Sequence, residues 1–164
     1  MSERIRVSYD AAAEGYIEAL GDELDGKPLD RWMLSRLAEA AVGPICDVGC
    51  GPGHVTAFLR ARGADAFGVD LSPGMVQVAQ ARFPGARFVV GDMRALPIED
   101  GGLGGVAAMY SLVHTPPDEL ASVLTELRRV LRPGGLLLLG APLQDDAGQT
   151  AIHAEELFGA RVDL

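Results

Sequence analysis

The 164-residue sequence has little cysteine and no long apolar run. Its two cysteines, Cys46 and Cys50, are too few for a framework of disulfide bonds and have no His or Cys partner at zinc-like spacing. We therefore expect reduced thiols, no bound metal and a cytoplasmic location. No stretch reaches the roughly 18 apolar residues that span a bilayer, and the first six residues lack the apolar core of a secretory signal. These absences predict a protein that has no membrane partner.

Basic residues are also scarce relative to acidic ones. The sequence has 14 Lys and Arg against 23 Asp and Glu, which gives a formal net charge of −9. Phosphate backbones are bound by clustered Lys and Arg, so this balance argues against nucleic acid as a partner. Hydrophobic residues make up 48% of the chain, which suffices for a core, and the length fits one domain of roughly 100–200 residues. The 21 glycines and 10 prolines predict many turns between short elements.

The apolar pattern predicts helices first and then strands that alternate with helices. Helices are expected at residues 10–20 and 29–42. Apolar runs then predict five strands, at residues 45–48, 64–69, 87–90, 104–110 and 136–139. Further helices are expected at residues 54–62, from Ser72 onward, and from about 115 to 131. Because the strands are apolar throughout, we predict an α/β domain with a doubly wound parallel sheet and helices on both faces.

A glycine-rich turn follows the first predicted strand, in the segment Asp47-Val-Gly-Cys-Gly-Pro-Gly53. Glycines at alternate positions let a backbone turn sharply and approach a ligand without obstruction by Cβ atoms. Asp70 ends the next predicted strand, 21 residues after Gly49. About 20 residues is the spacing at which a carboxylate meets the ribose diol in Rossmann-type folds. The pattern predicts a site for a ribose-containing ligand at the carboxyl ends of the strands.

Two residues of this turn argue against a dinucleotide. In the G-x-G-x-x-G/A fingerprint the sixth position is small, but His54 stands there in this sequence. Asp47 precedes the first glycine by two residues, and a carboxylate there repels pyrophosphate but attracts an ammonium or sulfonium group. The turn therefore favours a ligand that has a ribose and a positive charge but no phosphate.

Four segments together resemble, in order and spacing, the class I S-adenosylmethionine-dependent methyltransferases. They are Asp47-Val-Gly-Cys-Gly-Pro-Gly53, Gly68-Val-Asp70-Leu-Ser-Pro-Gly-Met75, Gly91-Asp92-Met93 and Leu131-Arg-Pro-Gly-Gly135. The resemblance is to the methyltransferase domain of small-molecule enzymes and covers about residues 9–141. It implies a Rossmann-like sheet in the order 3-2-1-4-5 and S-adenosyl-L-methionine as cofactor. It also implies one domain over residues 1–164, with N-terminal helices in 1–43, a cofactor-binding core in 44–141 and a short tail in 142–164.

The resemblance implies a set of cofactor-binding residues. Asp70 would bind both ribose hydroxyls, Asp47 would support the amino group, and Asp92 would accept from the adenine amine. Met75 would pack on the adenine, Ser111 would line the methionine end, and an N-terminal tyrosine would cover the carboxylate. The full set is Tyr9, Tyr16, Asp47, Gly49, Cys50, Gly51, Asp70, Leu71, Met75, Gly91, Asp92, Met93, Ser111 and Leu112.

Each of these side chains also has a purely structural interpretation. Asp47 and Asp70 could cap the turns that follow them, and Asp92 could be an ordinary turn aspartate. Met75 could be a core residue, and Tyr9 could pack between helices. These alternatives stay open at the level of the sequence.

The predicted function is transfer of a methyl group from S-adenosylmethionine to a small molecule. The cofactor supplies the reactive methyl, so a general base is needed only for an acceptor such as a hydroxyl. His114 is the candidate base, four residues past the fourth predicted strand. One alternative is a cofactor-binding but non-catalytic partner of another enzyme. The other is a nicotinamide-dependent oxidoreductase, against which His54 and Asp47 both count.

The chain departs from the family pattern after the fifth predicted strand. Family members usually continue with an antiparallel hairpin that places its last strand beside the fifth. Here residues 142–149 are predicted as a loop, 151–158 as a helix and 161–164 as the start of a strand, so we expect the hairpin to be missing or incomplete. An uncovered apolar strand at 136–139 would be an exposed edge, which proteins avoid. The edge could be covered by the tail, or by a second copy in a homodimer, or the chain could be a truncated product of a longer gene.

Overall fold

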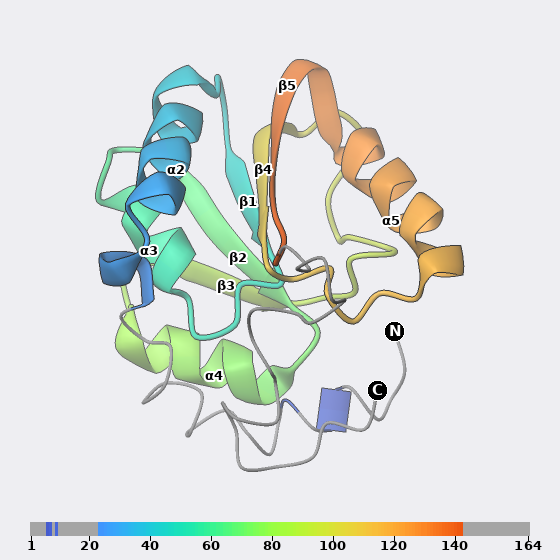
Figure 1. Ribbon diagram of the computed structural model, residues 1–164, viewed down its shortest axis with the longest axis horizontal. Helices are drawn as coiled ribbons and strands as arrows, with labels where there is room; N and C mark the ends of the chain where they lie inside the picture. The colour runs from blue at the N-terminus through green and yellow to red at the C-terminus, as the bar shows by residue number, and fades with distance from the viewer. Residues whose placement is uncertain (1–5, 8, 10–22, 143–164) are drawn as a thin grey trace, which may run out of the picture.

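The computed structural model describes residues 6, 7, 9 and 23–142 of the chain (Figure 1). The helix predicted at residues 10–20, with Tyr16, lies outside these residues, as do the elements predicted between 143 and 164. The elements, in chain order, are η1 (Glu23–Gly26), α2 (Pro28–Ala40), β1 (Ile45–Val48), α3 (His54–Arg60), β2 (Ala66–Asp70), α4 (Pro73–Arg82), β3 (Arg87–Val90), β4 (Leu103–Met109), α5 (Pro117–Val130) and β5 (Leu131–Gly140).

The five strands form one parallel sheet in the order β3-β2-β1-β4-β5. This confirms the predicted fold class and strand order. All four residues of β1 are buried, and β1 pairs with β2 on one side (Ile45 beside Ala66) and with β4 on the other (Ile45 beside Gly105). The chain leaves β1 in one direction to build β2 and β3, and returns to its other side for β4. A ligand site is expected beside this reversal, at the carboxyl ends of the strands.

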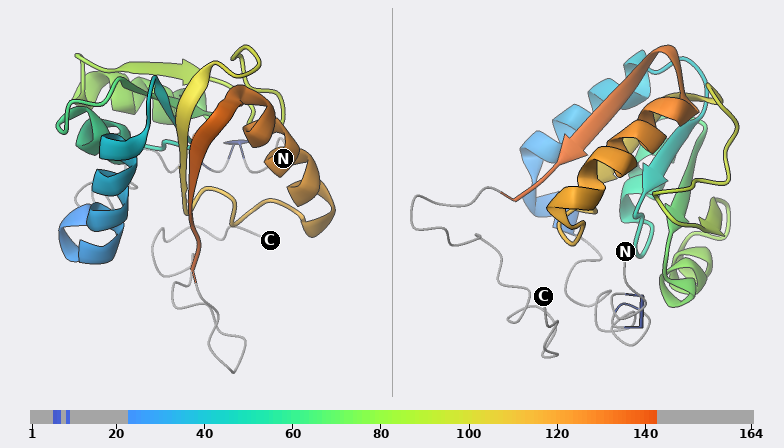
Figure 2. Two further views of the ribbon diagram at one scale, coloured as in Figure 1. Left: turned by 90° about the horizontal axis from the view of Figure 1, so that it is seen from above. Right: turned by 90° about the vertical axis from the view of Figure 1, so that its right-hand side faces the viewer.

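Helices cover both faces of the sheet, as predicted (Figures 1 and 2). On one face, Leu34 and Leu37 of α2 pack with Val55 and Leu59 of α3 against the sheet, while α4 packs beside β3. On the other face, α5 packs through a buried stripe of Val123, Leu127 and Val130. Their i, i+4, i+7 spacing gives α5 its apolar stripe. The two cores fix where the strand ends point, and therefore where the loops of the site emerge.

The last strand differs from its prediction. The sequence predicts a helix through Leu131, a Pro-Gly-Gly turn and a strand confined to 136–139, but β5 begins at Leu131, directly after α5. The pairing shows why: Leu131 lies beside Leu103, then the register shifts before Leu136 pairs with Gly105. The Pro-Gly-Gly segment lies in this register shift, with Gly134 at a φ of 77°, and the ribbon of β5 turns sharply near its start (Figure 1). What the sequence does not indicate is the pairing of Leu131 with Leu103, which places the start of β5 before this segment.

β5 is the edge strand of the sheet. Leu136, Leu137 and Leu139 are exposed, and within residues 23–142 no strand pairs with the outer side of β5. Within the described part of the chain the apolar edge of β5 is therefore uncovered, while the tail that the sequence analysis names as one possible cover lies outside the described residues. No helix in the described part is long and apolar enough to cross a membrane.

Candidate functional site

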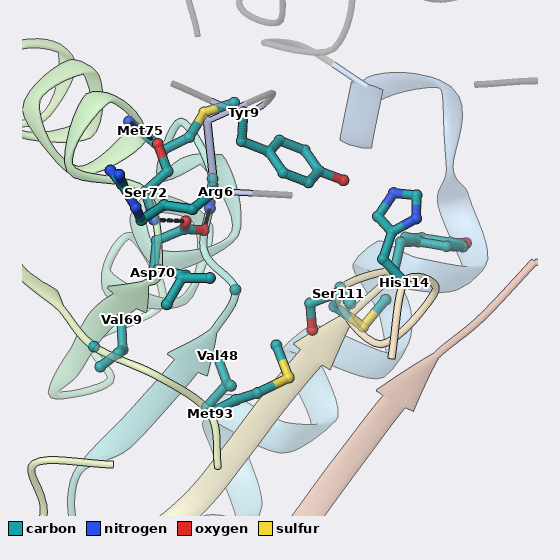
Figure 3. A pocket seen from close by; sticks show the side chains of 16 residues that line it. Arg6, Tyr9, Val48, Val69, Asp70, Ser72, Met75, Met93, Ser111 and His114 are labelled. Carbon is teal, nitrogen blue, oxygen red and sulfur yellow. Dashed lines mark hydrogen bonds between the residues drawn. The ribbon is translucent and has the colours of Figure 1, made fainter. Parts of the chain in front are cut away.

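A pocket opens at the carboxyl ends of β1, β2 and β4, where the glycine turn, the start of α4 and the segment after β4 meet (Figure 3). Two residues near the N-terminus, Arg6 and Tyr9, close one side of it. The lining residues are Arg6, Tyr9, Val48, Gly49, Gly51, Val69, Asp70, Leu71, Ser72, Met75, Gly91, Met93, Met109, Tyr110, Ser111 and His114. This is the location predicted from the reversal of strand order.

The glycine turn forms one wall of the pocket. Gly49 and Gly51 both have left-handed backbones, with φ of 71° and 49°. The Gly49 N–H donates to the carbonyl of Val69 at 2.8 Å, which ties the turn to β2. A Cβ atom added at Gly49 would lie 2.3 Å from the Cβ atom of Ser111. Glycine is therefore required here both by the backbone angle and by the approach of the segment after β4.

Asp70 holds the turn and also lines the pocket. Its Oδ2 accepts from the N–H of Gly51 at 2.8 Å, and its Oδ1 accepts from the N–H of Ser72 at 2.9 Å. The Ser72 hydroxyl in turn accepts from the N–H of Met75 at 3.1 Å and caps α4. Asp70 thus has the structural role that the sequence left open, and its place in the pocket is the one that the ligand-binding role requires. A carboxylate accepts roughly four hydrogen bonds, so its structural bonds do not prevent it from binding a ligand.

Asp47 lies beneath the glycine turn and not among the lining residues. It is only 2% exposed, and its Oδ2 accepts from the Thr56 hydroxyl of α3 at 2.7 Å. Burial raises the pKa of this carboxyl to about 6, against the lowering effects of the Thr56 hydrogen bond and of His54. Cys50 is also buried, and burial raises the pKa of its thiol. Neither residue is presented to the pocket directly.

Asp92 is held by an arginine at the rim. Arg94 donates to both oxygens of Asp92, with its Nη2 at 2.7 Å from Oδ2, and its Nη1 lies 3.0 Å from Glu119 of α5. The hydrogen bonds from Arg94 lower the pKa of Asp92. Asp92 is not a lining residue, whereas its neighbour Met93 is buried and lines the pocket.

The opposite wall carries two polar atoms that lack a partner. The Ser111 hydroxyl and the Nδ1 atom of His114 are buried and form no hydrogen bond within the described part of the chain. Burial lowers the pKa of His114, so its imidazole is neutral at pH 7. Its ring packs against Tyr9, with centroids 5.8 Å apart. Burial and the nearby Asp70 raise the pKa of Tyr9 to about 12, so this phenol keeps its proton.

The pocket brings together most of the residues predicted from the sequence. Of that set, Tyr9, Gly49, Gly51, Asp70, Leu71, Met75, Gly91, Met93, Ser111 and the candidate base His114 line it. Asp47 and Cys50 lie under the turn, Asp92 at the rim and Leu112 against the core, while Tyr16 lies outside the described residues. The lining residues that sequence reasoning missed are Arg6, Val48, Val69, Ser72, Met109 and Tyr110.

Some of the missed residues had a sequence signal. Val48 and Val69 are at or next to the ends of predicted strands, and Ser72 follows Asp70 directly, so their positions at the pocket could have been inferred. Tyr110 ends the strand predicted at 104–110 and carries the same signal, whereas nothing in the sequence indicates its left-handed backbone, at a φ of 56°. A non-glycine residue in this region is uncommon and is found preferentially at functional sites.

The donor set of the pocket fits the predicted cofactor. Asp70 offers a carboxylate at the end of β2, Met75 and Met93 are buried apolar walls, and the Ser111 hydroxyl is an unused hydrogen-bonding group. Gly49, with its left-handed backbone, leaves room for the Ser111 side chain against the turn. Within the described residues, no group of three His, Cys, Asp or Glu side chains is arranged to hold a metal ion.

Comparison with known proteins places the chain in a family. Residues 45–135 match the family described as "Methyltransferase domain". A malonyl-(acyl-carrier protein) O-methyltransferase from Serratia marcescens is 36% identical over 136 residues, covering 80% of this chain and 52% of that protein. A magnesium-protoporphyrin O-methyltransferase from Rhodobacter capsulatus is 40% identical over 101 residues, covering 58% of this chain and 44% of that protein. The chain spans about half the length of these curated relatives.

Solved structures agree with this assignment. A TehB-like SAM-dependent methyltransferase from Corynebacterium glutamicum superimposes with a TM-score of 0.65 at 25% identity, covering 86% of this chain and 77% of that one. The matched family region begins at β1 and ends inside β5, so it includes every strand whose end forms the pocket. The chain belongs to the methyltransferase domain family and has the Rossmann-like fold of the class I S-adenosylmethionine-dependent methyltransferases.

Proposed function

We propose that this chain binds S-adenosylmethionine in the pocket and transfers its methyl group to a small-molecule acceptor. The observation that carries the proposal is the position of Asp70. Its carboxylate ends β2, lines the pocket and is linked through the N–H of Gly51 to the glycine turn. This is the arrangement in which a carboxylate binds a ribose diol in Rossmann-type folds.

With the ribose at Asp70, other lining residues suit the remaining parts of the cofactor. Met75 and Met93 are buried apolar side chains that line the pocket and suit an adenine ring. Gly49 and Ser111 face the other end, where a methionine moiety would find exposed backbone and an unused hydroxyl. Asp47 lies beneath this end and adds negative charge above a pH of about 6, which favours a cationic ligand.

Methyl transfer requires the protein mainly to orient the two reactants. When bound, the cofactor supplies a sulfonium methyl group, which is the reactive centre. The chain's own residues exclude water and align the acceptor with that methyl group. His114 is the residue best suited to take a proton from an acceptor hydroxyl, because its imidazole is neutral and its Nδ1 atom is unpartnered. Tyr9, with its retained proton, would pack against such an acceptor beside His114.

The first experiment is a calorimetric titration with S-adenosylmethionine and with S-adenosylhomocysteine. Asp70→Asn should weaken binding by about 10- to 100-fold, since a hydrogen bond to a charged group contributes roughly 1.5–3 kcal/mol. Asp65→Asn is the matched control, because Asp65 is exposed and directly precedes the same strand, at the end away from the pocket. Failure of the folded wild-type protein to bind either compound would refute the proposal. Equal binding by both variants would refute the role of Asp70.

The second experiment separates catalysis from binding. The relatives named above act on different acceptors, so the screen should cover carboxylic acids and hydroxyl compounds rather than one substrate. On an acceptor that turns over, His114→Ala should lower kcat while leaving cofactor affinity within about twofold. Cofactor binding without methylation of any acceptor would instead support a non-catalytic partner protein. Tighter binding of reduced nicotinamide cofactor would favour an oxidoreductase.

We also propose that β5 pairs with a second copy of the chain. The support is the exposed outer edge of β5, with Leu137 and Leu139 among its exposed apolar side chains. Sedimentation velocity over a range of concentrations should reveal a dimer. A monomer at all concentrations would refute the pairing.

A further inference from the structure

His54, the first residue of α3, is tied to an element 31 residues earlier in the chain. Its Nε2 lies 3.1 Å from the Oε1 of Glu23 in η1, and its side chain is only 13% exposed. Because an ionised carboxylate only accepts hydrogen bonds, Nε2 is the donor. His54 directly follows Gly53, the last glycine of the turn. The end of the glycine turn is therefore attached to η1.

Glu23 has a second partner, on its other oxygen. Lys27 donates from its Nζ to the Oε2 of Glu23 at 3.0 Å. Burial opposes the ionisation of Glu23, but the hydrogen bonds from His54 and Lys27 overcome it and lower its pKa. The carboxylate is 17% exposed, so solvent screens these contacts less than it would on an open surface. We call Glu23, Lys27 and His54 the Glu23 clamp.

Lys27 extends the clamp to the opposite wall of the pocket. Its Nζ lies 3.9 Å from the ring centroid of Tyr110, within the range of a cation–π interaction. The Tyr110 hydroxyl donates to the Oδ2 of Asp30 in α2 at 2.9 Å, and its N–H donates to the carbonyl of Gly140 at 2.8 Å. These contacts surround the residue with the left-handed backbone, which lines the pocket directly after β4.

The two walls of the pocket thus share one acidic residue. One wall is the glycine turn, which ends at His54, and the other is the segment after β4, which begins at Tyr110. We propose that Glu23 is a positioning residue that holds these walls at the separation needed by the ligand. The inference deepens the proposed function and rests on it for the identity of the ligand, although the clamp itself can be tested without any ligand.

The test compares Glu23→Ala, Glu23→Gln and Glu39→Ala. Glu39→Ala is the matched control, since Glu39 is an exposed acid on α2 whose ion pair with Arg36 lies on the surface. Gln keeps an oxygen that can accept from one of the clamp donors. We expect Glu23→Ala to weaken S-adenosylhomocysteine binding about tenfold, Glu23→Gln about threefold or less, and Glu39→Ala not at all. A double-mutant cycle of Glu23→Ala with His54→Ala should give a non-additive result.

Amide hydrogen exchange of the unliganded protein provides a readout that a general loss of stability would not reproduce. The N–H of Gly51 donates to Asp70 at the end of β2, and the N–H of Gly53 donates to the carbonyl of Cys50, so their exchange reports opening of the turn. In Glu23→Ala these amides should exchange about tenfold faster, whereas that of Cys46 in β1 should be unchanged. Equal acceleration at all three sites, or none, would overturn the clamp. If the wild type binds no cofactor, the proposed function fails while the exchange experiment still decides the clamp.

Discussion

Replacing Gly49 with alanine adds one methyl group where the glycine turn and the segment after β4 lie close together. The new Cβ atom would lie 2.3 Å from the Cβ atom of Ser111, a separation that side chains do not tolerate, and the residue would keep a φ of 71°. Gly63 provides the matched control, because its φ is 82° and an added Cβ atom meets nothing within 4 Å. The two alanine variants therefore share the backbone strain and differ only in the steric clash.

The magnitudes follow from these two components. Alanine in the left-handed region costs about 1–2 kcal/mol, which should be the whole effect in Gly63→Ala. Overpacking adds about 1–3 kcal/mol, so Gly49→Ala should lose about 2–5 kcal/mol of unfolding free energy. For a chain of this size, each kcal/mol lowers Tm by about 2–4 °C. Urea and thermal unfolding, followed by circular dichroism, measure both quantities.

A rescue variant makes the test decisive. Ser111→Gly removes the atom that the new Cβ atom meets, so Gly49→Ala/Ser111→Gly should recover most of the excess loss relative to Gly63→Ala. Equal stabilities of Gly49→Ala and Gly63→Ala would refute the argument that the walls are in contact. Failure of Ser111→Gly to rescue would show that the clash is absorbed elsewhere.

Three further predictions concern the turn, the loop before β4 and the sheet edge. Burial raises the pKa of Asp47 to about 6, above its unfolded value of about 3.9, so its protonation stabilises the fold below pH 4 and this contribution is lost as the pH rises to 6. Urea unfolding from pH 4 to pH 7 should show that loss, roughly 2–3 kcal/mol, in the wild type relative to Asp47→Asn; parallel profiles would contradict it. Arg129→Ala should lower the unfolding free energy, because Arg129 donates to the carbonyls of residues 96 and 98 and to two carboxylates. Arg128→Ala, on the exposed side of α5, should change the unfolding free energy by less than about 0.5 kcal/mol. Leu137→Lys should abolish any dimer seen by sedimentation without lowering cofactor affinity, and a dimer that survives this change does not use β5.

The fold was predictable because its strands are short apolar runs between strong turn signals. β1 and β4 are buried nearly throughout. Short apolar runs that are buried on both faces are typical of the central strands of a parallel sheet. The first five residues of β5 were not predictable. Their Pro-Gly-Gly segment has the composition of a turn, and only the pairing of Leu131 with Leu103 makes it part of a strand. Here pairing with a segment far away in the sequence, which the local residues do not indicate, decides where the strand begins.

The site was predictable where its residues depend on spacing along the chain, and not where they depend on contacts between distant segments. Asp70 and Gly49 line the pocket because consecutive parallel strands end at the same edge. Asp92 does not line the pocket, because its carboxylate accepts hydrogen bonds from Arg94, two residues later, at the rim. The side chain of Tyr110 is held by Asp30 and Lys27, which are about 80 residues away in sequence. Such contacts leave no periodic signal.

The pairing of β1 with β4 has a consequence for how the molecule responds to a ligand. This seam is the only strand pairing that joins residues 45–90 to residues 103–140 in the described sheet (Figure 1). The pocket takes Gly49 and Asp70 from the first half, and Ser111 and His114 from the second. A ligand that contacts both halves acts as a reversible cross-link over the seam. Saturation with ligand at about 100 times Kd should therefore make separation of the two halves about 100 times rarer. Occupation of the pocket would then stabilise the fold itself.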